Sequence, residues 1–259
     1  MLVLYADGIG TGGLSDGDDR SILGVMAADV ARRVGGEAVR VPWPASMAGV
    51  GGPLSWERAT AIGVDALDEL ANSAPGVPLV LLGYSGGCRV IHDWLDSRDY
   101  QLGRVKAVGM LSDPFRPRGR WQAGTDDPGG WGICGERLGP LPGRTFWTSA
   151  AGDVISSCVA DSPLRTFADL SDKVPGSLLA DLRGHLTRGD WQLAAKMRLW
   201  RRDPLGYLRG LGARLDRARS DVRGYLTGAH TSAYAEPFEG GPSLRTRLAG
   251  TVAWKVNNG

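Results

Sequence analysis

Short apolar runs alternate with longer amphipathic stretches along the first half of the chain. The apolar runs occupy residues 2–6, 37–43, 77–83, 104–111 and 144–149. Between them, apolar residues recur at helical spacing and predict helices at residues 19–34, 56–73 and 87–97. The run at 77–83 is almost continuously apolar, which is typical of a strand buried on both faces. The alternation predicts an α/β fold, in which helices flank a central, mostly parallel sheet with residues 77–83 near its middle.

The pattern changes in the second half of the chain. Residues 112–143 are rich in Gly, Pro, Arg and Asp, which predicts a long surface loop region of the kind that lines a site. From 163 to 222, helical spacing continues without a convincing strand, which predicts a helical insert. Residues 1–162 and 223–259 would then form the core, and a terminal helix at 243–256 would return to the sheet.

Composition and charge exclude several classes of function. An apolar content of 42% and a charged content of 22% are those of an ordinary soluble domain. The net charge of +2 gives no basic field for nucleic acid. No apolar run is long enough to span a membrane, and the first residues lack the features of a signal peptide. We therefore expect a protein that binds no nucleic acid, is not integral to a membrane and is made without a signal peptide.

The three cysteines, Cys88, Cys134 and Cys158, are too few for a disulfide framework and are not spaced like zinc ligands. The sequence leaves open whether any two of them pair.

The segment Gly83-Tyr84-Ser85-Gly86-Gly87 matches the G-x-S-x-G pattern of a nucleophile elbow. A buried strand is predicted before it and a helix after it, as the elbow requires. A second match at residues 13–17 has no strand directly before it, so we interpret that match as chance. Ser85 is therefore the candidate nucleophile, and the alternative is an ordinary turn between strand and helix.

A serine hydroxyl needs an imidazole base, and the chain has three histidines. His92 follows Ser85 by seven residues, about 10 Å along the predicted helix, so it cannot return to the hydroxyl. His185 falls in the predicted insert, where a polar helix position is the simpler interpretation. His230 follows all predicted strands, which is where the chain order of serine, acid and histidine puts the base. We therefore favour His230.

The base needs a carboxylate, and Asp153 follows directly after the apolar run at 144–149. The carboxyl end of a strand is where enzymes built on parallel sheets gather their chemistry. Asp161 is the alternative acid, whereas Asp113 precedes Pro114 and is expected to start a turn.

Backbone amides must also stabilise the oxyanion, and the amide of Gly86 is one candidate. The loop at residues 7–13 is the natural source of a second amide. That loop also contains the G-x-G-x-x-G spacing of a dinucleotide-binding fold. The polar stretch at 14–19 interrupts the helix that such a fold requires at this point, and this disfavours the dinucleotide interpretation.

With these residues in place, the chain resembles the cutinase-like serine esterases, and more closely the lysin B enzymes of mycobacteriophages. Residues 5–9 resemble the strand end that forms the oxyanion hole, and 83–87 the nucleophile elbow. Residues 152–155 resemble the acid loop and 230–234 the base loop. The resemblance implies an α/β-hydrolase fold with these site residues: Ser85 as nucleophile, Asp153 as acid, His230 as base, and the amides of Ile9 and Gly86 as the oxyanion hole.

The long helical stretch between acid and base favours the lysin B enzymes over cutinases, which have only a short segment there. The resemblance implies hydrolysis of the ester between mycolic acids and arabinogalactan at the mycobacterial cell envelope, in phage-mediated lysis, without metal or cofactor. The chain departs from the family at Gly86, where glutamine is usual, and in lacking the disulfide that brackets a cutinase acid loop. Two alternatives stay open: a general cutinase, lipase, carboxylesterase or acyltransferase, and a non-catalytic envelope-binding protein on a hydrolase fold.

Substrate contacts are expected from Tyr84 in the elbow and from tryptophans, either as lining of an apolar groove or as simple packing residues. The tryptophan candidates are Trp121 and Trp131 in the long loop and Trp191 and Trp200 in the insert. The insert also holds twelve Lys and Arg against seven Asp and Glu. This excess fits either contact with an anionic envelope surface or a solvated helical face.

Overall fold

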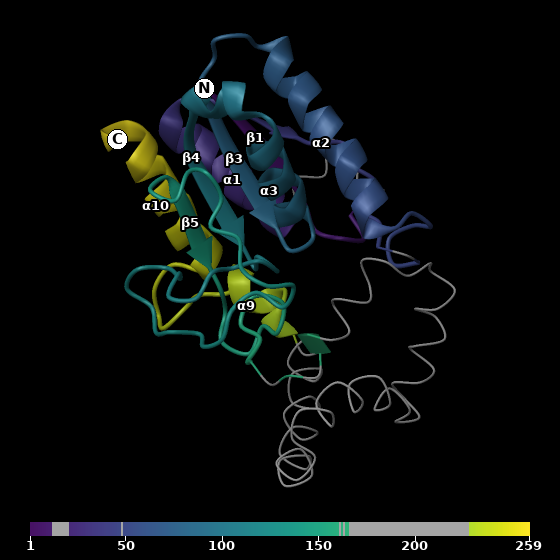
Figure 1. Cartoon of the computed structure of the whole chain (residues 1–259). Helices are drawn as coiled ribbons and strands as arrows, with labels where there is room; N and C mark the ends of the chain where they lie inside the picture. Colours follow the sequence, from purple (N-terminus) through teal and green to yellow (C-terminus); the bar gives the residue numbers. More distant parts are fainter. Residues whose placement is uncertain (12–20, 48, 161, 163, 166–227) are drawn as a thin grey trace, which may run out of the picture.

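The centre of the molecule is a five-stranded, fully parallel sheet in the order β2-β1-β3-β4-β5 (Figure 1). The computed structural model describes residues 1–11, 21–47, 49–160, 162, 164–165 and 228–259. The strands are β1 (Leu2–Ala6), β2 (Glu37–Arg40), β3 (Leu79–Tyr84), β4 (Val105–Leu111) and β5 (Thr145–Thr148). All five correspond to predicted apolar runs, and β3 is the middle strand, as predicted.

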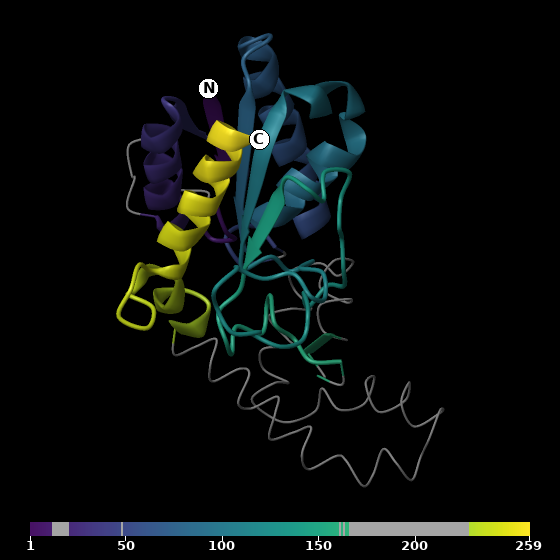
Figure 2. The same cartoon turned by 90° about the vertical axis from the view of Figure 1, so that its left-hand side faces the viewer.

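Helices cover both faces of the sheet and give the molecule three layers (Figure 2). One face carries α1 (Ile22–Val34) and α10 (Leu244–Asn258), and the other carries α2 (Trp56–Ser73) and α3 (Gly87–Ser97). Two short helices, η1 (Asp99–Arg104) and α9 (Ser232–Ala235), complete the described set. This three-layer arrangement confirms the predicted α/β architecture and fits the α/β-hydrolase fold that the resemblance implies.

Serine caps explain where three of these helices begin. Ser21, Ser55 and Ser243 each precede a helix, and each hydroxyl accepts a hydrogen bond from the amide three residues ahead, at 2.8, 3.2 and 3.4 Å. Such a cap gives a hydrogen-bond partner to one of the amides that the start of a helix leaves without one, and it stabilises the folded protein by about 1 kcal/mol.

The core lies on both sides of β3, whose six residues are all buried. Leu79 and Leu81 pack in the cluster under α2 and α3, whereas Val80 and Leu82 pack in the cluster under α1 and α10. Each buried aliphatic side chain contributes about 1.5–3 kcal/mol of transfer free energy. This two-sided burial explains why the β3 sequence lacks the polar alternation of a half-exposed strand.

The long segment at 112–143 crosses the carboxyl edge of the sheet and is fixed there by one buried guanidinium. Arg116 is fully buried and donates hydrogen bonds to carbonyl oxygens in two loops. The acceptors are the carbonyls of Ser156, Arg120, Gly129 and Gly130, at 2.6–3.0 Å. Arg116 therefore ties the long loop to the loop that follows β5.

The predicted insert at 163–222 falls outside the described residues, apart from residues 164 and 165.

Candidate active site

The strand register aligns the carboxyl ends of four strands, so the residues that follow them meet at one edge. Ala6 of β1 pairs with Gly83 of β3, and Leu111 of β4 lies between the ends of β3 and β5. The loop after β5 and helix α9 lie at this same edge (Figure 1). Four loops and α9 therefore contribute side chains to one place.

Ser85 forms the sharp turn between β3 and α3. Its φ of 51° is left-handed, a conformation that costs a non-glycine residue about 1–3 kcal/mol. The turn packs tightly against the end of β1: a Cβ on Gly87 would collide with the backbone oxygens of Ala6 and Asp7. The Ser85 amide donates to the Leu111 carbonyl at 3.0 Å. The segment thus has the geometry of a nucleophile elbow, and its close packing against β1 requires a glycine at position 87.

His230 lies beside this turn, in the short loop before α9. Its Nε2 is 2.9 Å from the Ser85 Oγ, and the imidazole is buried. The Tyr84 ring stacks on the imidazole with centroids 5.4 Å apart, and the Tyr84 hydroxyl donates to the His230 carbonyl. Tyr84, the residue before Ser85, therefore holds both the ring and the backbone of His230.

Asp153 completes the series from the loop after β5. Its Oδ1 lies 3.1 Å from the His230 Nδ1, and the side chain is fully buried. The structure therefore brings together Ser85, His230 and Asp153, the three residues that the sequence predicts as nucleophile, base and acid. The geometry is that of a Ser-His-Asp triad.

The Asp153 carboxylate is held by more donors than the imidazole alone. Its Oδ2 accepts from the hydroxyls of Ser112 at 2.5 Å, Tyr234 at 2.5 Å and Ser156 at 3.1 Å. Burial by itself raises the pKa of Asp153, but the hydrogen bonds and the charge interaction with His230 outweigh it. The pKa of Asp153 is therefore lowered, and the group is an anion that can stabilise an imidazolium.

Ser112, Ser156 and Tyr234 are the site residues that sequence reasoning missed. The Ser112 hydroxyl lies between Asp153 and His230, 3.0 Å from Nδ1. Burial, and secondly the charge of Asp153, raise the pKa of Tyr234 well above its usual value, so its hydroxyl remains a donor. The sequence contained one indication of Ser112. This residue directly follows β4 at the carboxyl edge of the sheet, and the same criterion selected Asp153.

The candidate oxyanion hole brings together Ile9 and Gly86. The Ile9 side chain packs on Gly86 so closely that a Cβ there would lie 2.5 Å from Ile9 Cγ1. Within the described part of the chain, neither amide takes part in a backbone hydrogen bond. The absence of a Cβ at Gly86 therefore makes room for the Ile9 side chain.

His92 and Asp113 form a separate buried pair, in which His92 Nε2 and Asp113 Oδ2 are 2.9 Å apart. Trp147 donates to the same oxygen at 2.9 Å. The other Asp113 oxygen accepts from the Phe115 amide at 2.9 Å, so Asp113 starts a turn through Pro114, as predicted. As predicted, His92 does not reach Ser85.

The predicted aromatic substrate contacts have different surroundings. Tyr84 packs against His230 and is buried. The half-buried Trp121 donates its indole N–H to the Thr125 carbonyl at 3.2 Å. Guanidinium groups of Arg118 and Arg165 each lie 3.7 Å from the Trp131 ring centroid, so Trp131 is engaged with neighbouring arginines. The remaining predicted candidates lie outside the described residues: Asp161, His185, Trp191, Trp200 and the second motif match at 13–17.

Within the described ranges, no cluster of three or more His, Cys, Asp or Glu side chains is placed to hold a metal ion. None of the helices described there is long and apolar enough to cross a membrane.

Comparisons with known proteins give matches in structure only. The sequence matches no family model and no curated protein. Among solved structures, lysin B from Mycobacteriophage D29 is 20% identical, with a TM-score of 0.46 over 62% of this chain and 67% of that one. The catalytic core of acetyl xylan esterase from Trichoderma reesei is 18% identical, with a TM-score of 0.45 over 70% and 97%. A cutinase-like protein from Cryptococcus sp. is 16% identical, with a TM-score of 0.41 over 60% and 78%.

Proposed function

We propose that the protein is a serine esterase that hydrolyses mycolyl esters of the mycobacterial cell envelope. One observation carries the esterase part: the left-handed Ser85 has its hydroxyl 2.9 Å from an imidazole whose other nitrogen is 3.1 Å from a buried carboxylate. Serine hydroxyls are weak nucleophiles, and this arrangement is the one that activates them.

In the first half of the reaction, Ser85 Oγ attacks the ester carbonyl carbon while His230 Nε2 takes the hydroxyl proton. The amides of Ile9 and Gly86 donate to the oxyanion that develops, a contribution worth about 3–4 kcal/mol per donor in serine proteases. Asp153 stabilises the imidazolium, which then protonates the leaving alkoxide. The products are an acyl-serine and a free alcohol.

The second half repeats these roles with water. His230 removes a proton from a water molecule, the hydroxide attacks the acyl-serine, and the imidazolium returns the proton to Ser85 Oγ. The carboxylic acid is released and the enzyme is regenerated. The donors from Ser112, Tyr234 and Ser156 keep Asp153 in place through both halves.

The substrate part of the proposal rests on the sequence. The motifs at 5–9, 83–87, 152–155 and 230–234 resemble those of the lysin B enzymes, as does the long stretch between Asp153 and His230. That family implies a mycolic acid as the acyl group and an arabinogalactan hydroxyl as the leaving group. The enzyme would act at the envelope during phage-mediated lysis, after synthesis in the host cytoplasm.

Mass analysis of lipids released from purified mycobacterial wall tests this function. Wild-type protein should release free mycolic acids, and Ser85→Ala should release none. Hydrolysis of p-nitrophenyl butyrate without mycolate release would show that the protein is a general carboxylesterase or cutinase instead. Transfer of the acyl group to an added sugar acceptor would instead make the protein an acyltransferase.

A further inference from the structure

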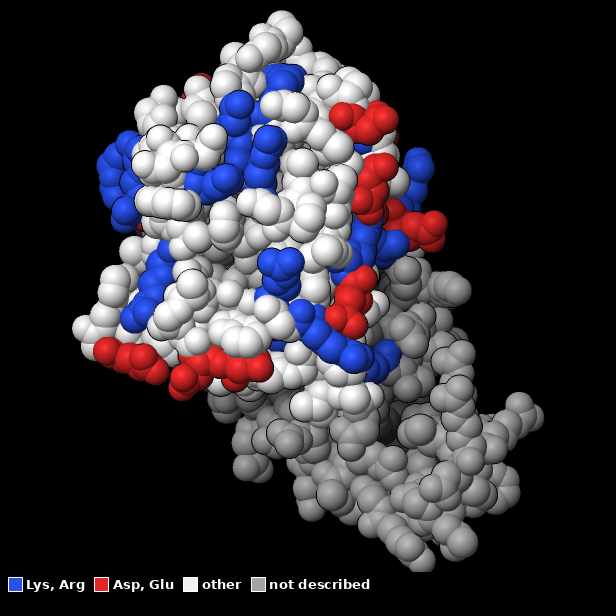
Figure 3. Space-filling view, turned by 60° about the vertical axis from the view of Figure 1, so that its left-hand side comes forward, with Lys and Arg blue, Asp and Glu red and all other residues white. Residues whose placement is uncertain are grey.

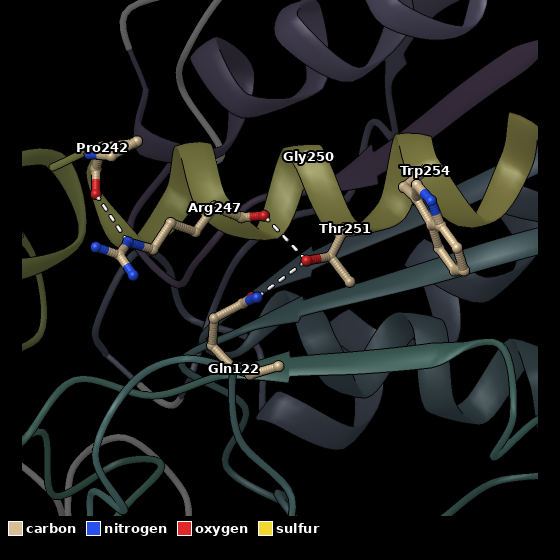
Figure 4. Close-up of a pocket in the computed structure, with 7 residues that line it drawn as sticks. Gln122, Pro242, Arg247, Gly250, Thr251 and Trp254 are labelled. Carbon is tan, nitrogen blue, oxygen red and sulfur yellow. Dashed lines mark hydrogen bonds between the residues drawn. The ribbon is translucent and has the colours of Figure 1, made fainter.

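A hollow of about 560 Å³ lies beside α10, outside the candidate active site (Figure 4). Ser85, His230 and Asp153 are not among the residues that line it. Its lining comes from α10, from the residues just before that helix and from the long loop: Gln122, Ala123, Pro242, Arg247, Gly250, Thr251 and Trp254. Four of these residues recur at intervals of three, one and three along α10, so they share one face of the helix.

The folding of α10 does not explain why residue 250 is a glycine. Its φ is not left-handed, and a Cβ at this position would meet no atom within 4 Å. Glycine in a helix interior costs roughly 1 kcal/mol relative to alanine, and neither packing nor backbone conformation requires it here. Its effect is to lower the helix surface between Arg247 and Trp254, where the hollow lies.

Trp254 forms one wall of the hollow with an indole that is 63% exposed. In Figure 4 the indole projects from α10 on the side of the helix that carries Thr251. A tryptophan in this position leaves a large, flat apolar surface in water that burial against the protein would have removed.

Polar groups are fixed on the floor of the hollow. Gln122 donates to the Thr251 hydroxyl at 2.9 Å and accepts from Thr148 at 3.0 Å, which links α10 to the end of β5. Arg247 donates to the carbonyls of Pro242, Gly124 and Phe238, at 3.2, 3.3 and 3.4 Å. Within the part of the chain that the structure describes, these bonds use three of the five guanidinium N–H groups.

We propose that this hollow binds a stretch of a neutral saccharide chain, with the C–H face of a sugar on Trp254 and its hydroxyls on Arg247, Gln122 and Thr251. An exposed indole beside fixed donors and acceptors suits a ligand that is apolar on its faces and polar at its edge. The lining holds one charged side chain and no carboxylate. On the side of the molecule that carries α10, basic groups are scattered over the upper and middle part of the face, and acidic groups lie along its lower edge and at the right (Figure 3).

Native gel electrophoresis with soluble arabinogalactan, mannan or dextran in the gel tests the proposal. At least one polysaccharide should retard the wild-type protein, and Trp254→Ala should raise the apparent Kd by about tenfold or more. Gly250→Ala should also weaken binding, although it raises the Tm because alanine favours the helix. These two effects in opposite directions separate loss of the site from loss of folding.

Tyr100→Ala is the matched control, because Tyr100 is another highly exposed aromatic residue and lies on η1. It should be retarded like the wild type, and so should Ser85→Ala, since the proposal does not depend on the esterase reaction. Absence of retardation by all three polysaccharides would overturn the proposal. Equal retardation of Trp254→Ala and wild type would also overturn it.

Discussion

The hydroxyl of Tyr234 offers a sharp test of how the site is held together. It donates to Asp153 Oδ2 at 2.5 Å and accepts from the Ala150 amide at 3.0 Å, in fully buried surroundings. Tyr234→Phe keeps the ring but removes both bonds, together with the 3.3 Å hydrogen bond between this hydroxyl and the Ser156 hydroxyl. A hydrogen bond to a charged group is worth about 1.5–3 kcal/mol, and a buried amide left without an acceptor costs about 1–3 kcal/mol. Because Ser112 and Ser156 still donate to Asp153, we expect the unfolding free energy to fall by about 2–4 kcal/mol.

This loss should depend on pH. The pKa of Asp153 is lowered in the folded state, partly by the Tyr234 hydroxyl, relative to about 3.9 in an unfolded chain. A lowered carboxyl pKa contributes stability that is present above the unfolded value and disappears as the pH falls through the folded value. The difference between wild type and Tyr234→Phe should therefore be full near neutral pH and shrink below about pH 4, leaving the share that comes from Ala150.

Urea unfolding followed by circular dichroism measures both effects. Tyr100→Phe is the matched control, because its hydroxyl also donates to a carboxylate, that of Asp68 at 3.2 Å, but Tyr100 is 65% exposed. We expect the control to change the unfolding free energy by no more than about 0.5 kcal/mol. A loss in Tyr234→Phe as small as that of the control would refute the reasoning, and a loss independent of pH would refute the part assigned to the charge of Asp153.

Four further substitutions separate catalysis from stability. His230→Ala should lower kcat on p-nitrophenyl butyrate by at least about 10³-fold. His92→Ala should keep most of kcat but lower the unfolding free energy by about 3–5 kcal/mol. The reverse ranking would contradict the assignment of the base. Asp153→Asn should lower kcat by about 10⁴-fold in the same assay, and a loss below about tenfold would exclude Asp153 as the acid. Arg116→Met should reduce the unfolding free energy by more than about 3 kcal/mol in urea, because several carbonyls lose their donor; a loss below about 1 kcal/mol would show that the two loops hold without it.

Much of the fold could be predicted because the central strands β3 and β4 are buried on both faces. Continuous apolar runs such as 77–83 cannot be explained by a half-exposed sheet, and the parallel order follows from the helices between them. The same logic predicted Ser85 and Asp153, since each follows a strand at the carboxyl edge. His230 followed from its place after the last strand.

The supporting contacts could not be predicted because they depend on side-chain geometry between distant loops. Tyr234 looks like an ordinary aromatic residue in a short helix, and only the folded chain brings its hydroxyl to a carboxylate 81 positions earlier. The pairing of His92 with Asp113 likewise joins a helix to a loop that the sequence explained as a turn. Motifs record the order of residues, whereas these contacts depend on how the loops cross.

The central claim is that Ser85 is an activated nucleophile, and covalent labelling tests it most directly. The folded protein should be incubated with a fluorophosphonate probe and the modified peptide identified by mass spectrometry. The account predicts one probe per chain on Ser85, with esterase activity lost in proportion to labelling. Folded protein that remains unlabelled, or that is labelled elsewhere while Ser85→Ala keeps its activity, would contradict it.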